Sequence, residues 1–117
     1  MKRFPSIKKN SDFQKVYRTG NSHANRQLVM YVMRAESQDT RIGISASKKV
    51  GNSVKRNRAR RLMRESVRIS DAEIRQGYDL IIIARNTING KKCADVKKSI
   101  EAALRRLKVI EKKKVEK

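Results

Sequence analysis

The sequence has little of several residue types that mark common protein classes: one cysteine, one histidine, one proline and no tryptophan among 117 residues. Cys93 and His23 alone cannot form a disulfide framework or a Cys/His cluster with zinc-ligand spacing. No stretch approaches the roughly 20 apolar residues of a membrane span. The segment 1–5 carries Lys2 and Arg3, but polar residues follow it instead of the apolar core of a signal peptide. We therefore expect a protein of the cytoplasm without disulfides or a membrane segment.

Acidic residues are also scarce, since 11 Asp and Glu stand against 31 Lys and Arg, which gives a net charge of +20. A compact chain with this charge repels itself, and a polyanionic partner would relieve the repulsion. Membrane surfaces attract cations too, but stable binding there needs a face with large apolar groups or a lipid anchor. The composition therefore favours nucleic acid over a membrane as the partner.

Hydrophobic periodicity predicts one domain over residues 1–117, of the α+β class, with helices covering a sheet. The expected elements are a helix at 8–19, a strand at 27–33, a strand at 41–47, a helix at 52–70, a strand at 78–85 and a helix at 94–107. Ser11 and Gln14 have the spacing of a capping box for the first helix, and Gly20 would end it. We expect a polar turn at 37–40 and a basic tail that frays at 108–117.

The densest chemical signal is the basic block at residues 48–64, which runs from a strand end through a glycine turn into a helix. Arg56, Arg60, Arg64 and Arg68 recur every four residues, about 6 Å apart along a helix, which is comparable with phosphate spacing. A solvated helix face is the usual meaning of a charge run. Here Glu65 is the only acidic residue between positions 41 and 70, so helical ion-pair partners are missing and a phosphate partner is favoured.

Three of the few aromatic residues form a second group: Phe13 and Tyr17 share one side of the first helix, and Tyr31 lies in the next predicted strand. Exposed rings of this kind can stack on the bases of single-stranded nucleic acid. On the residues alone, however, rings at helical spacing more commonly pack in the core.

No arrangement of residues indicates catalysis by the protein itself. The carboxylates are scattered over different elements, no Ser/His/Asp or Cys/His set is available, and residues 48–52 lack the glycines of a P-loop. We predict no catalytic residue, and the sequence leaves open whether a carboxylate binds a metal.

Residues 48–65, with the core Arg56-Asn57-Arg58, closely resemble the signature of the bacterial ribonuclease P protein family. The resemblance extends to residues 8–17, 25–27, 43–45 and 78–85, nearly the whole chain apart from its tail. It implies an α/β sandwich in αβββαβα order, with three helices, a mixed four-stranded sheet and an extra strand near 21–25. It also implies a left-handed crossover from the strand at 41 to the strand at 78.

The resemblance further implies a subunit of a holoenzyme whose RNA component cleaves precursor tRNA with bound Mg²⁺. The expected protein is a monomer in a 1:1 complex with that RNA. By similarity, the 5′ leader of precursor tRNA lies in a cleft lined by Phe13, Tyr17 and Tyr31. The expected contacts with the RNA subunit are Lys48, Lys49, Lys55, Arg56, Asn57, Arg58, Arg60, Arg61, Arg64 and Arg68.

Three alternatives remain at this point: a general or ribosomal RNA-binding protein, a nuclease that acts without RNA, and a protein that reads DNA in the major groove. Recognition helices usually mix Asn, Gln, Ser and Arg to contact base edges, whereas this helix face is nearly all arginine. The face suits phosphates better than base edges.

Overall fold

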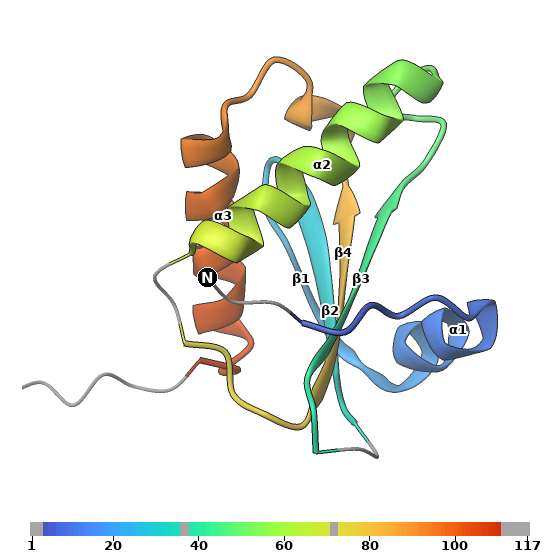
Figure 1. Ribbon diagram of the computed structural model, residues 1–117, viewed down its shortest axis with the longest axis vertical. Helices are drawn as coiled ribbons and strands as arrows, with labels where there is room; N and C mark the ends of the chain where they lie inside the picture. Colours follow the sequence, from blue (N-terminus) through green and yellow to red (C-terminus); the bar gives the residue numbers. More distant parts are fainter. Residues whose placement is uncertain (1–3, 36–37, 71–72, 111–117) are drawn as a thin grey trace, which may run out of the picture.

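Figure 1 shows the computed structural model, which describes residues 4–35, 38–70 and 73–110. The elements are α1 (Asn10–Thr19), β1 (Asn21–Ala24), β2 (Leu28–Arg34), β3 (Arg41–Ala46), α2 (Ser53–Ile69), β4 (Tyr78–Ala84), the short 3₁₀ helix η1 (Asn86–Ile88) and α3 (Cys93–Arg106). This order confirms the predicted α+β class and the αβββαβα arrangement, including the short strand β1. Among the described residues, no helix has the length and apolar character needed to cross a membrane.

The four strands form one mixed sheet in the order β1-β2-β4-β3. β1 pairs antiparallel with β2, and β2 pairs antiparallel with β4, with Tyr31 opposite Ile81. β3 pairs with β4 in parallel, with Ile42 beside Leu80. The isoleucine-rich strand β4 is therefore central, as its run of apolar residues predicts.

The connection from β3 through α2 to β4 is left-handed. In Figure 1 both parallel strands run upward, α2 lies in front of the sheet, and the chain passes from β3 to β4 on its left. The common right-handed crossover would pass to the right. The handedness implied by the family resemblance is thus present.

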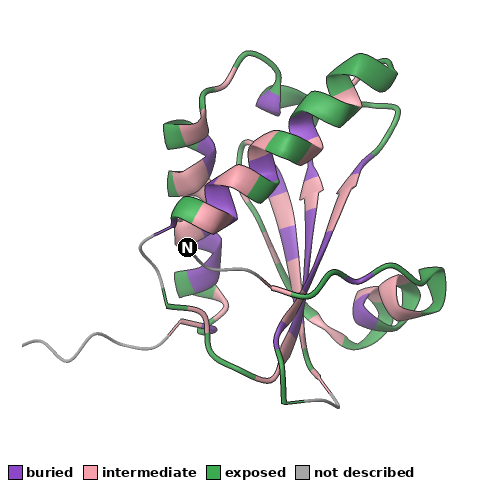
Figure 2. Ribbon diagram, in the orientation of Figure 1, coloured by how far each residue is buried: buried purple, intermediate pink, exposed green. Residues whose placement is uncertain are grey.

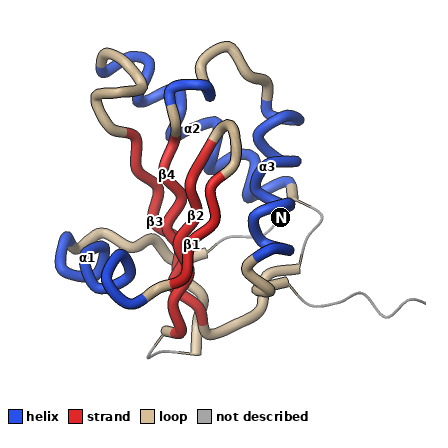
Figure 3. Tube along the Cα trace, turned by 180° about the vertical axis from the view of Figure 1, so that it is seen from behind, coloured by secondary structure: helices blue, strands red, loops and turns tan. Residues whose placement is uncertain are grey.

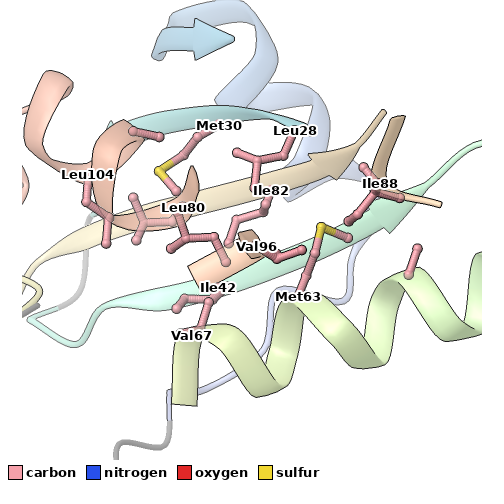
Figure 4. Close-up of a cluster of buried hydrophobic side chains, with 14 of the residues drawn as sticks. Leu28, Met30, Ile42, Met63, Val67, Leu80, Ile82, Ile88, Val96 and Leu104 are labelled. Carbon is pink, nitrogen blue, oxygen red and sulfur yellow. The ribbon is translucent and has the colours of Figure 1, made fainter. Parts of the chain in front are cut away.

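The main hydrophobic core lies between one face of the sheet and the helices α2 and α3 (Figures 2 and 4). Alternate residues of β2, β3 and β4 point into it, so Met30, Ile42 and Ile82 meet Met63 of α2 and Ile100 of α3. All five side chains are less than 8% exposed. This packing holds α2 across the sheet and leaves its opposite arc to solvent.

The second face of the sheet is covered only at one end, by α1 and the segment before it. Figure 3, which views the molecule from behind, shows α1 beside this end of the strands. A smaller cluster forms here around Ile7, Val16 and Ile81, with Phe13, Tyr17, Tyr31, Met33 and Ile83 packed against it at partial exposure. Because this cover is incomplete, these five side chains stay partly exposed.

Two local predictions for the first helix have different outcomes. The capping box of Ser11 and Gln14 is wrong, because the helix begins at Asn10 and Lys9 is the N-cap, without a side-chain cap. Ser11 and Gln14 are already helical, and the Lys9 carbonyl accepts the amides of Asp12 and Phe13. The stop at Gly20 is confirmed, and its amide donates to the carbonyl of Val16.

The polar turn is present at Gln38 and Asp39, which are exposed, but its last residue and Val109 of the predicted tail are buried. Within the turn predicted at 37–40, Thr40 is only 1% exposed, and its hydroxyl donates to the Arg75 carbonyl and accepts from the Tyr78 amide. The predicted tail begins with ordered residues: Val109 is 1% exposed, its carbonyl accepts from the Arg75 amide, and Ile110 pairs with Ile74. Residues 37 and 111–117 lie outside the described part of the chain.

Candidate nucleic-acid interface

The turn that leads into α2 is built by residues 47–52. The amide of Val50 donates to the Ser47 carbonyl, and the buried Val50 side chain anchors the turn in the main core. Gly51 follows with φ 142°, a conformation that L side chains rarely adopt. Asn52 then caps α2, since its Oδ1 accepts from the Lys55 amide at 3.0 Å. The fixed turn presents Lys48 and Lys49 to solvent beside the start of the helix.

The long helix α2 separates its apolar and basic residues sharply. Ala59, Met63, Ser66 and Val67 are buried against the sheet and α3. The residues expected to contact RNA lie at the surface, as the exposed outer arc in Figure 2 shows. Lys48, Lys49, Lys55, Asn57, Arg58, Arg61 and Arg64 are exposed, and Arg56, Arg60 and Arg68 are partly buried. Together these ten residues form what we call the α2 basic surface.

Some side chains of the α2 basic surface are held by local contacts. Arg60 Nη1 donates to Asn57 Oδ1 at 2.7 Å, and Arg58 Nη2 donates to the Lys91 carbonyl at 2.9 Å. These bonds use one nitrogen of each guanidinium and leave the others for phosphate oxygens. The first bond links Asn57 to Arg60, and the second holds Arg58 to the segment that precedes α3.

Arg68 differs from the rest of the four-residue ladder because it pairs with Glu65. Its Nε donates to Glu65 Oε2 at 3.1 Å, and Nη2 contacts Oε1. The paired guanidinium lowers the pKa of the Glu65 carboxyl, which stays ionised. Since the pair cancels charge at this end of the helix, the positive charge of the α2 basic surface is concentrated around Arg56 to Arg64. The role of Arg68 in RNA binding stays a prediction.

The three aromatic residues lie together on the second face of the sheet. We call this group the aromatic cleft, after the leader site that the family resemblance implies. The rings of Tyr17 and Tyr31 meet edge to face with centroids 5.1 Å apart, and Phe13 lies 6.3 Å from Tyr17. All three are partly buried, so each ring packs on the small cluster and still presents an edge or face to solvent. Burial raises the pKa of Tyr17, with a further contribution from Tyr31, so its hydroxyl adds no negative charge at neutral pH.

Gly43 forms the floor beneath Phe13. A Cβ at this position would lie 2.8 Å from the Phe13 Cζ atom and 3.2 Å from the Ile7 Cβ atom. The absence of a side chain therefore allows the ring to rest directly on β3. Gly43 and Ser45 pair with Ile81 and Ile83 of β4, so β3 presents small residues on the side of the aromatic cleft.

Sequence reasoning missed Arg41, which fastens α1 to the sheet. Its guanidinium binds both carboxylate oxygens of Asp79 and also Asp12 of α1, one residue before Phe13. These bonds raise the pKa of Arg41, which is charged at any pH in use. The sequence did contain a signal for this pair. Asp79 stands near the start of a strand that is otherwise apolar, and a carboxylate in such a strand needs a partner.

The carboxylates of the described residues do not form a metal centre. No group of three or more His, Cys, Asp and Glu side chains there is arranged to hold an ion. Asp12 and Asp79 share Arg41, Glu65 binds Arg68, and Asp95 accepts the Lys92 amide at the start of α3. Each of these carboxylates therefore has a structural partner.

Comparison with known proteins gives evidence on the family of this chain that does not depend on the geometry of the site. The family model described as Ribonuclease P matches residues 1–108. A ribonuclease P protein component of Clostridium botulinum is 47% identical over 95 residues, which cover 80% of this chain and 86% of the relative. The corresponding protein of Clostridioides difficile is 45% identical over 105 residues, covering 89% and 92%.

Solved structures agree with the sequence comparison. The RNase P protein of Staphylococcus aureus superposes with a TM-score of 0.81 at 39% identity, covering 93% of this chain and all of that one. The RNase P protein of Thermotoga maritima gives a TM-score of 0.75 at 25% identity, covering 94% and 100%. The match extends over both the α2 basic surface and the aromatic cleft, because it covers nearly the whole chain.

Proposed function

The chain belongs to the ribonuclease P protein family, with a subunit role in processing the 5′ ends of tRNAs, and we propose how its two surfaces divide that work. The α2 basic surface binds the RNA subunit of the holoenzyme. The aromatic cleft binds the 5′ leader of precursor tRNA. Family membership favours this processing role over a general or ribosomal RNA-binding role.

The observation that carries the first assignment is the separation of faces on α2. One arc is buried in the main core, while the other presents Arg61, Arg64 and their basic neighbours with a single acidic residue among them. Arginine forks give paired hydrogen bonds to phosphate oxygens, and each contact releases counterions from the RNA. The surface therefore suits recognition of a folded RNA through its backbone.

The aromatic cleft suits a single strand. Its rings lie on one face of the sheet with Gly43 and Ser45 beside them, so unpaired bases can stack on Phe13, Tyr17 and Tyr31 without being read for sequence. A leader differs from tRNA to tRNA, and stacking tolerates that variation. The mature product has no leader to stack on these rings, which gives selectivity for the precursor.

We assign the chemistry to the RNA subunit, with Mg²⁺ bound there. The carboxylates named above are engaged in structural pairs, and the described residues offer no fitting metal centre. The protein then contributes positioning of the leader and relief of repulsion between two RNAs. We propose that it acts in the cytoplasm as a monomer in a 1:1 complex with the RNA.

The test is a reconstitution. The purified protein is mixed with a ribonuclease P RNA and a labelled precursor tRNA at near-physiological salt and low Mg²⁺, and leader release is followed beside protein-only and RNA-only controls. The proposal expects cleavage that appears or accelerates only when both components are present. Cleavage by the protein alone would make it a nuclease, and no effect of the protein would favour a general RNA-binding role.

A further inference from the structure

A pocket of about 510 Å³ lies beside α2 on the flank of the main core, and none of the three aromatic-cleft rings lines it. Its apolar wall is formed by Phe4 and Ile7, by Ile42 and Ile44 of β3, and by Val67 of α2. Figure 4 shows Ile42 and Val67 facing each other across the β3–α2 boundary. The volume is within the range of sites that hold a small organic group.

The segment before α1 closes this pocket because it is fixed along the edge strand β3. The Ile42 amide donates to the Pro5 carbonyl at 2.9 Å, and the Ile7 amide donates back to the Ile42 carbonyl at 3.1 Å. This short parallel pairing sends Ile7 into the small cluster and Phe4 toward the main core. Phe4 is thus held in place as one wall of the pocket by the hydrogen bonds of its segment to β3.

The rim of the pocket is basic. Lys8, Arg64 and Arg68 contribute to the lining, and no acidic residue does. Arg68 is paired with Glu65, whereas Arg64 and Lys8 form no ion pair within the described part of the chain. An apolar wall with two available cations at its rim suits a flat apolar group that carries a phosphate.

The pocket is continuous with the α2 basic surface. Arg64 lines it, and the same residue lines a shallow hollow on the outer arc of α2, together with Arg58, Arg61 and Leu62. An RNA backbone on the α2 basic surface therefore passes the mouth of the pocket. The side of Arg64 that faces the pocket can hold a phosphate of that same strand.

We propose that this pocket receives one unpaired nucleotide of the RNA bound along α2. Its base enters between Phe4, Ile44 and Val67, and its phosphate lies at Arg64 and Lys8. A base inside a double helix is stacked and inaccessible, so the nucleotide comes from a bulge, loop or single-stranded joint. The proposal rests on the function proposed above. It adds to the phosphate contacts along α2 a second contact with the RNA, in which the pocket binds a single base.

The first experiment uses the full-length protein with labelled Ile and Val methyl groups, titrated with each of the four nucleoside monophosphates and followed by NMR. Ribose 5-phosphate and inorganic phosphate are the matched controls without a base. The proposal expects the methyl signals of Ile44 and Val67 to shift with at least one nucleotide and not with either control. Equal shifts for all anions, or none for any, would overturn it.

Variants then separate the pocket from the aromatic cleft. Phe4→Ala should weaken the nucleotide binding that the Ile44 and Val67 methyl signals report about tenfold, as expected when a stacking wall is removed. Phe13→Ala should leave the binding reported by these two pocket signals unchanged, whatever it does to stacking at the aromatic cleft. Arg64→Gln, which keeps the apolar wall, should weaken nucleotides and leave nucleosides unaffected. An equal effect of Phe4→Ala and Phe13→Ala would place the nucleotide elsewhere.

The last step uses the ribonuclease P RNA and chemical probing of its nucleotides. The proposal expects one unpaired nucleotide to be protected by the wild type and to become reactive again with Phe4→Ala, while the remaining protections persist. If the RNA binds through α2 but no protection depends on Phe4, the pocket assignment fails and the proposed function stands. If the RNA does not bind at all, both fail.

Discussion

Arg41 and Asp79 form a two-pronged ion pair between the edge strand β3 and the central strand β4. Arg41 Nε donates to Asp79 Oδ1 at 3.0 Å and Nη2 donates to Oδ2 at 2.8 Å. The Asp79 side chain is 4% exposed and that of Arg41 is 32% exposed. A third contact, 3.4 Å from Arg41 Nη1 to Asp12, ties α1 to this pair. The orientation of the aromatic cleft therefore depends on a charge pair at its edge.

Arg41→Lys tests this dependence. A lysine keeps the charge but cannot form two parallel bonds to one carboxylate while reaching Asp12. We expect the free energy of unfolding in urea to fall by about 1.5–3 kcal/mol, the typical value of hydrogen bonds to charged groups. The affinity for leader-bearing precursor should fall with it, because Phe13 follows Asp12 directly. Arg75→Lys, on an exposed side chain, is the matched control. Equal stability of the two variants would contradict the assigned role of Arg41.

Gly43→Ala tests the floor of the aromatic cleft. The added Cβ would meet the Phe13 ring at 2.8 Å, so the ring must move away from β3. We expect weaker binding of leader-bearing precursor, in the direction of Phe13→Ala, where stacking contributes about 1–3 kcal/mol per base. Binding of the RNA subunit should stay unchanged.

Ser45→Ala, two residues along the same face, is the control for Gly43→Ala. Both variants are compared by titrating labelled precursor with leader, mature tRNA and RNA subunit in separate assays. Equal reductions in affinity for the precursor and the RNA subunit would show that Gly43 acts through overall stability and not through the ring.

The sequence predicted the order and position of the helices and long strands because their apolar residues follow clear periods. The apolar run at Leu80–Ala84 is too short for a typical helix and indicated a central strand, and the helical wheel of α2 separated Met63 and Val67 from the arginines. The short strand β1 has exposed, polar residues and no such period, so only family resemblance indicated it. Its position depends on pairing with β2, which is information from distant residues.

The two candidate sites also differ in how far the sequence alone predicts them, again because one depends on local spacing and the other on residues far apart in the chain. The α2 basic surface follows from local spacing, and the structure leaves its residues at the surface. The aromatic cleft needed the family resemblance, because half-buried rings and core rings have the same pattern in sequence. Arg41 and the Phe4 pocket were missed, since both are formed by residues far apart in the chain.

Val109→Ala tests the ordered start of the tail. Val109 is buried beside the main core, and its carbonyl accepts from the Arg75 amide at 2.7 Å. Removing two buried methyl groups should lower the free energy of unfolding by roughly 1.5–3 kcal/mol. The exposed Val54 of α2 is 73% accessible, and Val54→Ala is the matched control with an expected change within about 0.5 kcal/mol. Equal effects of the two substitutions would mean that residues 108–110 contribute nothing to the fold.

The α2 basic surface makes a prediction that depends on salt. Each phosphate contact releases counterions, so the logarithm of the binding constant falls linearly with the logarithm of salt concentration. Replacing Arg56, Arg60 and Arg64 by alanine should therefore weaken binding of the RNA subunit. It should also reduce the slope by about 0.7–0.9 for each phosphate that the variant no longer binds. Filter binding at four or more salt concentrations measures both quantities.

The control for this triple variant removes the same charge from another helix. Lys98, Arg105 and Arg106 are exposed on α3, and their replacement by alanine changes the net charge of the protein by the same three units. A general attraction between cation and polyanion would lower the slope equally in both variants. A localised interface predicts a clear reduction for α2 and little change for α3, because screening confines the interaction to about 8–10 Å at physiological salt. An unchanged slope in the α2 variant would move the RNA-subunit interface to a different face.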